Sequence, residues 1–433
     1  MDPSWNISDL TRASLTFEQY QWATPSVLTD PFYSVDKSSA LVPAGTLIKV
    51  EKHTNTSLYS IPPATALSRF VYQSESLNGS LMPVSAYVLW PHTPRSSADG
   101  YQVVAFAHGT SGIAADGAPS HMKNLWQHYL APFNLALQGY IVVATDYAGL
   151  GVSRTAHGAP IVHEYVASPS HANDICYSVQ AAQVAFPELS KKFVVLGHSQ
   201  GGGAAWAVAQ RQAVHSIPGY LGAIALSPVT TMIDERMAPP TLSAFGFLIA
   251  AGMENIFPNF KRSDILTPDG VQKLKLIQDT GGCSATVVTV LIGTDPTKPE
   301  DPTKPEWTKN NFVKEFQVRV KSGGRKIRGP LLVIHGDADP ILNISLTDKA
   351  VGQTALNFPA AQIEYLRVPG ASHNAALTSS QPVWMDWIAD RFNGVVQESG
   401  LKVSQSQVAM PISAYQAELN SWVAPATIFY EAP

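Results

Sequence analysis

The sequence predicts an α/β fold: a mostly parallel sheet with helices on both faces and an inserted, largely helical cap. Strand-like apolar runs alternate with helix-like stretches along most of the chain, as in a parallel sheet with crossover helices. That alternation stops between about residues 230 and 325, where the cap is expected. Of the 433 residues 45% are hydrophobic, and only 14% are charged, against about 25% in an average globular protein. This composition is sufficient for a large buried core.

Charge and hydropathy narrow the choice of partners. The net charge of −4 gives no reason to expect a nucleic acid or an anionic membrane surface. The longest apolar run, Phe245–Met253, is too short to cross a bilayer, so no transmembrane segment is predicted. Met1–Trp5 lacks the basic start and apolar centre of a signal peptide, so we expect either an intracellular protein or a secreted one whose signal was removed. Contact of the cap with a lipid interface stays open.

The first half of the chain is expected to hold an arm and the first part of the core. Residues 1–44, rich in Pro, Ser and aromatic side chains, are expected to be irregular, and the core is expected to run from 45 to 229. An amphipathic crossover helix is predicted over Met122–Gln138, and another helix after Ser168-Pro169, where serine can cap and proline fits the first turn. The predicted strands cover 46–52, 69–73, 83–90, 102–107, 140–146, 192–196 and 220–226.

The second half is expected to hold the cap, over 230–325, and the rest of the core, over 326–395, followed by an extension over 396–433. Strands are predicted at Leu331–His335 and Gln362–Val368. The cap contains the apolar run, which either covers a pocket or packs against the core. It also contains two successive copies of Asp-Pro-Thr-Lys-Pro-Glu, at 295–300 and 301–306, which we interpret as a lengthened surface loop.

A Gly-x-Ser-x-Gly pattern occupies the turn between the strand 192–196 and a small-residue helix predicted over Gly202–Gln212. The pattern reads Gly197-His198-Ser199-Gln200-Gly201. Such a turn exposes a serine hydroxyl to a base, and the next amide, that of Gln200, lies at a helix N-terminus facing a developing oxyanion. Ser199 is therefore the predicted nucleophile. The alternative is a glycine-rich turn of some other α/β protein.

The partners of such a serine follow in the order acid, then histidine, each on a loop after a strand. Asp337 and Asp339 both follow the strand at 331–335. We choose Asp339, which directly precedes a proline, as the acid, and expect Asp337 to fix the loop through backbone hydrogen bonds. His373, on the loop after the last predicted strand, is the expected base.

The second oxyanion donor is expected on the loop after an early strand. The run Val103–Ala107 leads into His108-Gly109-Thr110, so Thr110 is the predicted donor beside Gln200, and His108 is expected to brace the loop.

A metal or cofactor site is not predicted. His157, His163, His171 and Asp174 could suggest metal ligands, but their spacing lacks a tight ligand pattern, and no dinucleotide or phosphate-binding loop occurs.

Three motifs together resemble the fungal secretory-lipase, or lipase A-like, family of α/β-hydrolases, which includes trichothecene-deacetylase-type esterases. They are Ala107–Ser120, Thr145–Gly151 and Gly197–Gly201, and two shorter segments, Asp30–Tyr33 and Gly281–Cys283, are similar to that family too. The resemblance covers most of the chain, from about residue 28 to about 393. It implies an α/β-hydrolase core, a cap bearing a lid, and activity on carboxylic esters, with Ser199, Asp339 and His373 in the roles given above.

One departure from the family concerns its cysteines. Gly117 stands where lipase A-like members usually carry a cysteine paired to the cap, whereas Cys283 matches the second partner. Cys283 is therefore expected to pair with Cys176 or, with it, to be a free thiol. Free thiols are more typical of an intracellular enzyme.

The sequence as a whole predicts a serine carboxylic-ester hydrolase of the lipase or esterase type that needs no cofactor. Deacetylation of a bulky specialised metabolite such as a trichothecene, and acyl transfer by the same three residues, are the alternatives. A non-catalytic binding protein and a peptidase of the same fold are less favoured.

Overall fold

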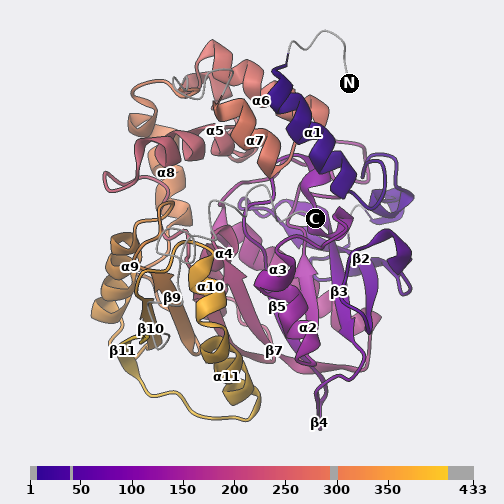
Figure 1. The fold of residues 1–433 in the computed structure, drawn as a ribbon, viewed down its shortest axis with the longest axis vertical. Helices are drawn as coiled ribbons and strands as arrows, with labels where there is room; N and C mark the ends of the chain where they lie inside the picture. The colour runs from indigo at the N-terminus through magenta and orange to yellow at the C-terminus, as the bar shows by residue number, and fades with distance from the viewer. Residues whose placement is uncertain (1–6, 40–41, 293–300, 408–433) are drawn as a thin grey trace, which may run out of the picture.

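The computed structural model describes residues 7–39, 42–292 and 301–407 and confirms the predicted α/β class (Figure 1). One eleven-stranded sheet runs through this part of the chain in the order β1-β2-β3-β6-β5-β7-β8-β9-β10-β11, with β4 paired to β5. The strands are β1 (Leu47–Glu51), β2 (Thr65–Glu75), β3 (Leu81–Pro91), β4 (Ser96–Ser97), β5 (Gly100–Ala107), β6 (Ile141–Thr145), β7 (Leu189–His198), β8 (Tyr220–Leu226), β9 (Leu331–Gly336), β10 (Gln362–Val368) and β11 (Gly400–Gln405).

The strands from β6 to β11 along that order are parallel, whereas β1, β2, β3 and β6 pair antiparallel. Every residue of β6 and β9 is buried, as expected for strands covered on both faces. The carboxyl ends of neighbouring strands coincide, since Ala107 pairs with Gly197 and Gly336 with Val368. The loops after these strands therefore meet at one edge of the sheet.

Helices cover both faces of the sheet. The helices are α1 (Asp9–Gln21), α2 (Pro132–Leu137), α3 (Ser168–Ala185), α4 (Gln200–Gln212), α5 (Pro239–Ile256), α6 (Pro268–Thr280), α7 (Ser284–Ile292), α8 (Asn311–Val320), α9 (Ile344–Asn357), α10 (Ala375–Ser379) and α11 (Gln381–Phe392). Buried side chains of α3, α4 and α9 form one core with the sheet, and those of α2, α10 and α11 form another. A third cluster joins the helices α5 to α8, which lie together at the upper end in Figure 1, with α1 beside α7.

The N-terminal arm is not irregular as expected, because α1 occupies much of it. Ser8 caps this helix by accepting a hydrogen bond from the Thr11 N–H. The buried positions Thr11, Ser14, Leu15 and Glu18 recur at helical spacing, but only Leu15 is apolar. A search for apolar periodicity therefore misses this helix, whose buried face is mostly polar.

The helix expected over Met122–Gln138 is also wrong. The chain forms a left-handed turn and one 3₁₀ turn (His128–Leu130) there, and only the short α2 is α-helical. The helix after residue 167 is confirmed, with its proline in the first turn, but Ser168 is the first helical residue and not the cap. The segment proposed as an extension includes β11, which lengthens the sheet at β10.

The repeated hexapeptide is described only in its second copy, because residues 295–300 lie outside the described residues. In that copy the Asp301 carboxylate accepts hydrogen bonds from the Ser243 hydroxyl and the Thr303 N–H, and Thr303 is buried, whereas residues 304–306 are exposed.

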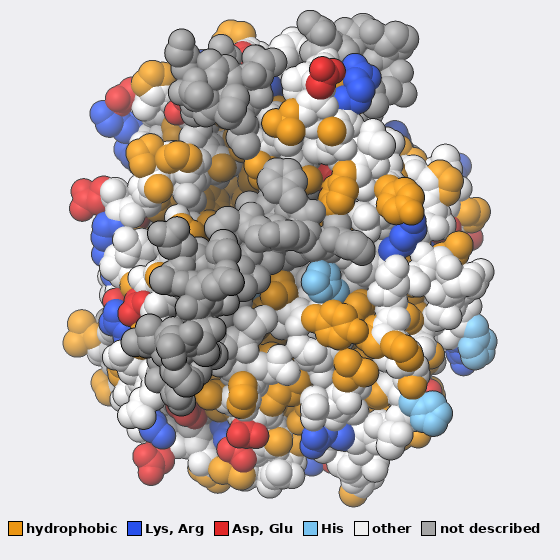
Figure 2. All heavy atoms as spheres, viewed as in Figure 1, with side chains coloured by type: hydrophobic (Ala, Val, Ile, Leu, Met, Phe, Trp, Pro, Cys, Tyr) orange, Lys and Arg blue, Asp and Glu red, His pale blue; other side chains and the backbone are white. Residues whose placement is uncertain are grey.

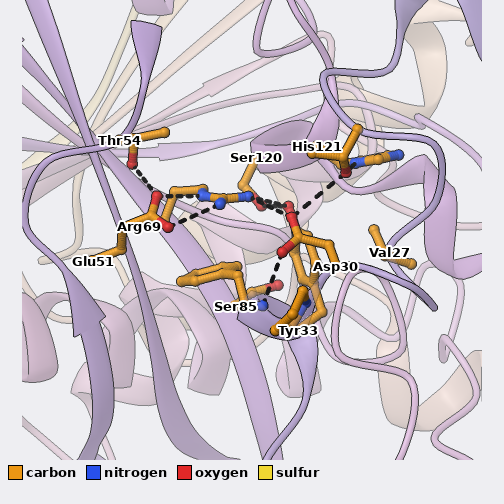
Figure 3. Close-up of polar contacts among 12 residues, drawn as sticks. Val27, Asp30, Tyr33, Glu51, Thr54, Arg69, Ser85, Ser120 and His121 are labelled. Atoms are coloured by element: carbon orange, nitrogen blue, oxygen red, sulfur yellow. Dashed lines mark hydrogen bonds and ion pairs between the residues drawn. The ribbon is translucent and has the colours of Figure 1, made fainter. Parts of the chain in front are cut away.

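A partly buried ion cluster connects the arm to the sheet, and Figure 3 shows it. The Arg69 guanidinium on β2 binds both carboxylate oxygens of Glu51, at 2.9 and 3.1 Å, and one oxygen of Asp30 at 3.2 Å. Its centre lies 4.1 Å from the centroid of the Phe32 ring. Asp30 also accepts a hydrogen bond from the Phe32 N–H. One arginine thus binds both the segment Asp30–Tyr33 and Glu51 of β1.

On the coloured part of the face shown in Figure 2, the charged side chains lie mostly toward the margin. None of the helices in the described part of the chain combines the length and hydropathy needed to span a bilayer.

Replacing Arg69 by methionine should strongly destabilise the fold, because it leaves the carboxylates of Asp30 and Glu51 without their cation. We expect the free energy of unfolding to fall by about 3–5 kcal/mol, measured by urea unfolding followed by circular dichroism. Lys309→Met is the control, since Lys309 pairs with Glu306 on the surface and its loss should change stability by less than about 1 kcal/mol. Equal unfolding midpoints for the two variants would contradict the role given to Arg69.

Candidate active site

Ser199 lies in a strained turn between β7 and α4. Its backbone has φ of 60° and ψ of −118°, which a non-glycine residue adopts only when its surroundings enforce it. The two flanking glycines allow this turn, because a Cβ on Gly197 would lie 2.0 Å from the Gly201 carbonyl oxygen and one on Gly201 would lie 1.9 Å from that of Ala107. No other residue type fits there. The two glycines of the Gly-x-Ser-x-Gly pattern thus have a direct steric cause.

Backbone hydrogen bonds hold the serine from both sides. The Ser199 N–H donates to the Leu226 carbonyl at 2.9 Å, and the Ser199 carbonyl accepts from Gly203 and Val229, both at 3.1 Å. Ser199 and His373 line the same cavity, of about 200 Å³, at the carboxyl edge of the sheet.

The predicted base and acid are in contact. The Nδ1 atom of His373 lies 2.7 Å from Asp339 Oδ2, which leaves Nε2 of that ring as the atom able to accept a proton. The other carboxylate oxygen of Asp339 accepts hydrogen bonds from the Ile341 and Leu342 N–H groups, at 2.8 and 2.9 Å. Burial alone would raise the pKa of Asp339, but the neighbouring His373 and a hydrogen bond from His335 outweigh it and lower that pKa. Asp339 is therefore held as the anion.

His335 is a second partner of this acid and was not predicted from the sequence. Its Nε2 lies 3.0 Å from both Asp339 Oδ2 and the Leu342 carbonyl, so this nitrogen carries the proton. Its Nδ1 faces the Thr347 hydroxyl at 2.8 Å. Asp337 instead accepts a hydrogen bond from the Gly370 N–H at 2.6 Å, so it connects the two loops as expected. His335 ends the predicted strand, and only its distance from Asp339 in space reveals the contact.

The two predicted oxyanion residues lie close together. The Thr110 hydroxyl is 3.4 Å from the Gln200 carboxamide oxygen and 2.9 Å from the Tyr165 hydroxyl. The N–H of Gly109, the neighbouring amide on this loop, already donates to the Gln127 carboxamide at 2.6 Å. Because its N–H is already bonded, Gly109 cannot donate to an oxyanion, which favours Thr110 as the donor on this loop. The Thr110 hydroxyl, in contrast, is engaged with side chains.

His108 braces its loop as expected. Its ring nitrogens lie 2.7 Å from the Gly109 carbonyl and 3.2 Å from the Asp146 carbonyl, and its ring stacks on Tyr147 at 4.3 Å between centroids. Burial lowers the pKa of His108 to about 4, so the ring is neutral near pH 7. A neutral ring with both nitrogens beside backbone carbonyls is suited to support the loop and not to transfer a proton.

Two of the three histidines that could have suggested a metal, His163 and His171, are buried in a ring stack, whereas His157 is exposed. His163 and His171 lie 5.2 Å apart and nearly parallel, and His171 stacks on Tyr147. His163 Nδ1 faces the Ala148 carbonyl, and its Nε2 accepts from the Gln200 carboxamide at 3.0 Å. Among the residues with described positions, no group of three or more His, Cys, Asp or Glu is arranged to hold a metal ion.

One wall of the cavity comes from the helices of the proposed cap. Ser284 and Val288 of α7 and Phe245 of α5 line it, with Ile341 and Leu342 from the loop that carries Asp339. The remaining lining includes Gly109, Thr110, Trp126, Gln127, Tyr165, His198, Val229 and Asn374. The cavity is thus mostly apolar, with polar groups close to Ser199.

Both cysteines are free thiols and buried. Cys283 precedes α7 and pairs with the backbone of Gly112, and a side chain on Gly117 would contact Ser111 and Gly112. The position that carries a cysteine in lipase A-like proteins is therefore adjacent to this pair.

Comparison with known proteins identifies the family and the fold of the chain. Residues 117–376 match the model of the serine aminopeptidase S33 family. No curated protein matches the sequence. Lipase A from Candida antarctica is similar in structure, with a TM-score of 0.71 and 16% identity over 90% of this chain and 92% of that one. The rice cell wall degrading esterase LipA from Xanthomonas oryzae has a TM-score of 0.60 and 17% identity, over 82% and 99% of the two chains.

A putative hydrolase from Legionella pneumophila gives a TM-score of 0.63 and 16% identity, over 81% of this chain and 100% of that one. At such identities these likenesses show the fold, which is the α/β-hydrolase fold.

The steric account of the turn predicts opposite effects for two helical glycines. Gly201→Ala places a methyl group against the Ala107 carbonyl and should abolish folding or reduce the urea midpoint sharply. Gly352→Ala, in α9, meets no atom within 4 Å and should stabilise the protein by about 0.5–1 kcal/mol. A Gly201→Ala protein with normal stability would contradict the proposed close approach.

Proposed function

We propose that this chain, which belongs to the serine aminopeptidase S33 family, is a carboxylic-ester hydrolase that uses Ser199 as nucleophile, His373 as base and Asp339 as acid. The observation that carries the proposal is that Ser199 and His373 line one cavity while Asp339 binds the far nitrogen of His373. The lipase and esterase folds of similar structures are consistent with it.

The mechanism follows from these positions. His373 Nε2 takes the proton of the Ser199 hydroxyl as the serine attacks the ester carbonyl, and Asp339 stabilises the resulting imidazolium. The Thr110 and Gln200 amides donate to the oxyanion of the tetrahedral intermediate, and each such donor contributes roughly 3–4 kcal/mol in comparable sites. The imidazolium then protonates the leaving alcohol. Water, deprotonated by His373, cleaves the acyl-enzyme through the same oxyanion site.

The lining of the cavity favours an ester over a peptide N-terminus. An aminopeptidase needs a carboxylate to bind the α-ammonium group of its substrate, and no Asp or Glu side chain is among the described residues that line the cavity. Its apolar wall, formed by side chains such as Val229, Phe245 and Val288, suits an acyl group.

The size of the cavity favours a short acyl group. Its volume of about 200 Å³ is below the ~300–1,000 Å³ of sites that enclose drug-sized ligands. This supports deacetylation of a larger alcohol as a second candidate, in which the alcohol part lies outside the enclosed volume.

The acid role of Asp339 can be separated from loop support by two matched variants. Asp339→Asn removes the charge beside His373 and disturbs its tautomer, so kcat should fall by roughly 10⁴-fold. Asp337→Asn keeps an oxygen for the Gly370 N–H and should retain kcat within about threefold, since Asp337 does not bind His373. The rate of p-nitrophenyl acetate hydrolysis, measured for both variants, distinguishes the two roles. Equal losses in both variants would contradict the assignment of the acid.

A series of p-nitrophenyl esters from acetyl to palmitoyl tests the function itself. We expect the highest kcat/KM for acetyl to butyryl esters, because longer chains exceed the cavity, and a loss of at least about 10⁴-fold in Ser199→Ala for every ester. Aminoacyl p-nitroanilides, run in parallel, should not be cleaved. Full activity of Ser199→Ala would overturn the proposal, and a maximum at palmitoyl would overturn the short-chain preference.

A further inference from the structure

We infer that the left-handed turn Leu125–Gln127 is a positioning device for the oxyanion site: it fixes the peptide whose N–H belongs to Thr110. This inference rests on the proposed function, since it assigns a task within that reaction. None of the three residues was predicted to have a role, because the sequence analysis placed them in a helix.

The turn is strained and firmly held. Leu125, Trp126 and Gln127 have φ values of 56°, 53° and 43°, all in the left-handed region. A non-glycine residue in this region is strained, and successive ones are rare. The Leu125 and Gln127 side chains are buried, and the Asn124 side chain accepts a hydrogen bond from the Trp126 N–H at 3.1 Å. Such strain persists only where the surrounding structure enforces it, and it concentrates at functional sites.

Consecutive residues of the turn bind both polar backbone groups of Gly109. The Gln127 carboxamide oxygen accepts from the Gly109 N–H at 2.6 Å, and the Trp126 indole N–H donates to the Gly109 carbonyl at 3.2 Å. His108 Nδ1 lies 2.7 Å from the same carbonyl oxygen. That carbonyl and the Thr110 N–H belong to one planar trans peptide and point in opposite directions. Fixing the carbonyl therefore fixes the direction of the Thr110 N–H.

Hydrogen bonds to a carbonyl also polarise the N–H of the same peptide, which strengthens it as a donor. The second proposed donor has an equivalent arrangement, because the Ser199 carbonyl, in the peptide that supplies the Gln200 N–H, accepts from Gly203 and Val229. Both donor peptides are thus held through their carbonyl oxygens before any substrate binds. Such preorganisation is what makes an oxyanion site effective.

Gln127 further connects this loop to the other two. Its carboxamide nitrogen donates to His198 Nδ1 at 2.8 Å, and His198 Nε2 donates to the His373 carbonyl at 3.2 Å. Burial lowers the pKa of His198 to about 3, so the ring stays neutral and Nδ1 remains an acceptor. One side chain therefore joins the oxyanion loop to the residue before Ser199 and, through it, to the loop of the base.

Trp126→Phe tests the inference, because it removes the indole N–H and keeps an aromatic ring at the cavity. We expect kcat for p-nitrophenyl acetate to fall by about tenfold, with KM nearly unchanged. This loss is smaller than the roughly 10²–10³-fold fall in kcat that follows removal of a complete oxyanion-hole donor. The inhibition constant of an aryl trifluoromethyl ketone, which Ser199 converts to a tetrahedral oxyanion, should rise by the same factor. Trp90→Phe is the control, since its indole N–H donates to Ser68 on β2 and its loss should change neither constant.

A second readout does not depend on how much of the protein folds. A thionoester places sulfur, a weaker hydrogen-bond acceptor, in the oxyanion site, so the ratio of ester to thionoester kcat/KM reports that site alone. We expect this ratio to fall in Trp126→Phe and to stay constant in Trp90→Phe. An unchanged ratio in Trp126→Phe, or a change in its KM only, would overturn the inference. The proposed function would still stand in that case if Ser199→Ala were inactive. Full activity of Ser199→Ala would overturn both.

Discussion

The close approach of α4 to the end of β5 is the constraint on which the site depends. Gly201, in the first turn of α4, lies so near Ala107 that a single added carbon would overlap the Ala107 carbonyl oxygen. This contact places the N-terminus of the helix beside the loop after β5. Thr110 and Gln200, which come from segments about ninety residues apart, therefore lie close together, with the Thr110 hydroxyl 3.4 Å from the Gln200 carboxamide oxygen. A parallel sheet with coincident carboxyl ends then adds the loops of Asp339 and His373 to the same edge.

Backbone strain gathers at this edge and is opposed by buried polar contacts. Tyr147, Val166, Ser199 and Ser227 all have positive φ, as does the turn at residues 125–127. Tyr147 is held between the rings of His108 and His171, and Ser227 donates to the His373 carbonyl. In a low-dielectric interior each satisfied contact is strong and each unmet polar group is costly. The rigidity that a preorganised site needs thus comes from the same contacts that keep the strained turns in place.

The sequence predicted those features that depend on local pattern or on loop order. Most core strands were found because buried parallel strands are nearly continuous apolar runs, and Asp339 was separated from Asp337 by its position before a proline. Features set by contacts distant in sequence were missed. The α1 helix buries a mostly polar face, so a hydropathy pattern does not show its helical period. The turn at 125–127 contains no glycine that would indicate positive φ. Gln127 acts through partners that only the folded chain brings near, and the contact of His335 with Asp339, four residues on, depends on the shape of the loop after β9.

The arm and the proposed cap are joined by hydrogen bonds beside the place where lipase A-like proteins usually carry a disulfide. The carboxylate of Glu18, on α1, accepts from the N–H groups of Cys283 and Thr286, at 2.8 and 2.9 Å, and from the Thr286 hydroxyl at 2.6 Å. These N–H groups lie at the start of α7, where a helix leaves amides without internal partners and favours negative charge.

Glu18 therefore caps a helix that belongs to another part of the chain, and that helix supplies Ser284 and Val288 to the cavity wall. The N-terminal arm thus contributes to the site indirectly, because it holds the helix that forms part of the wall of the cavity beside Ser199.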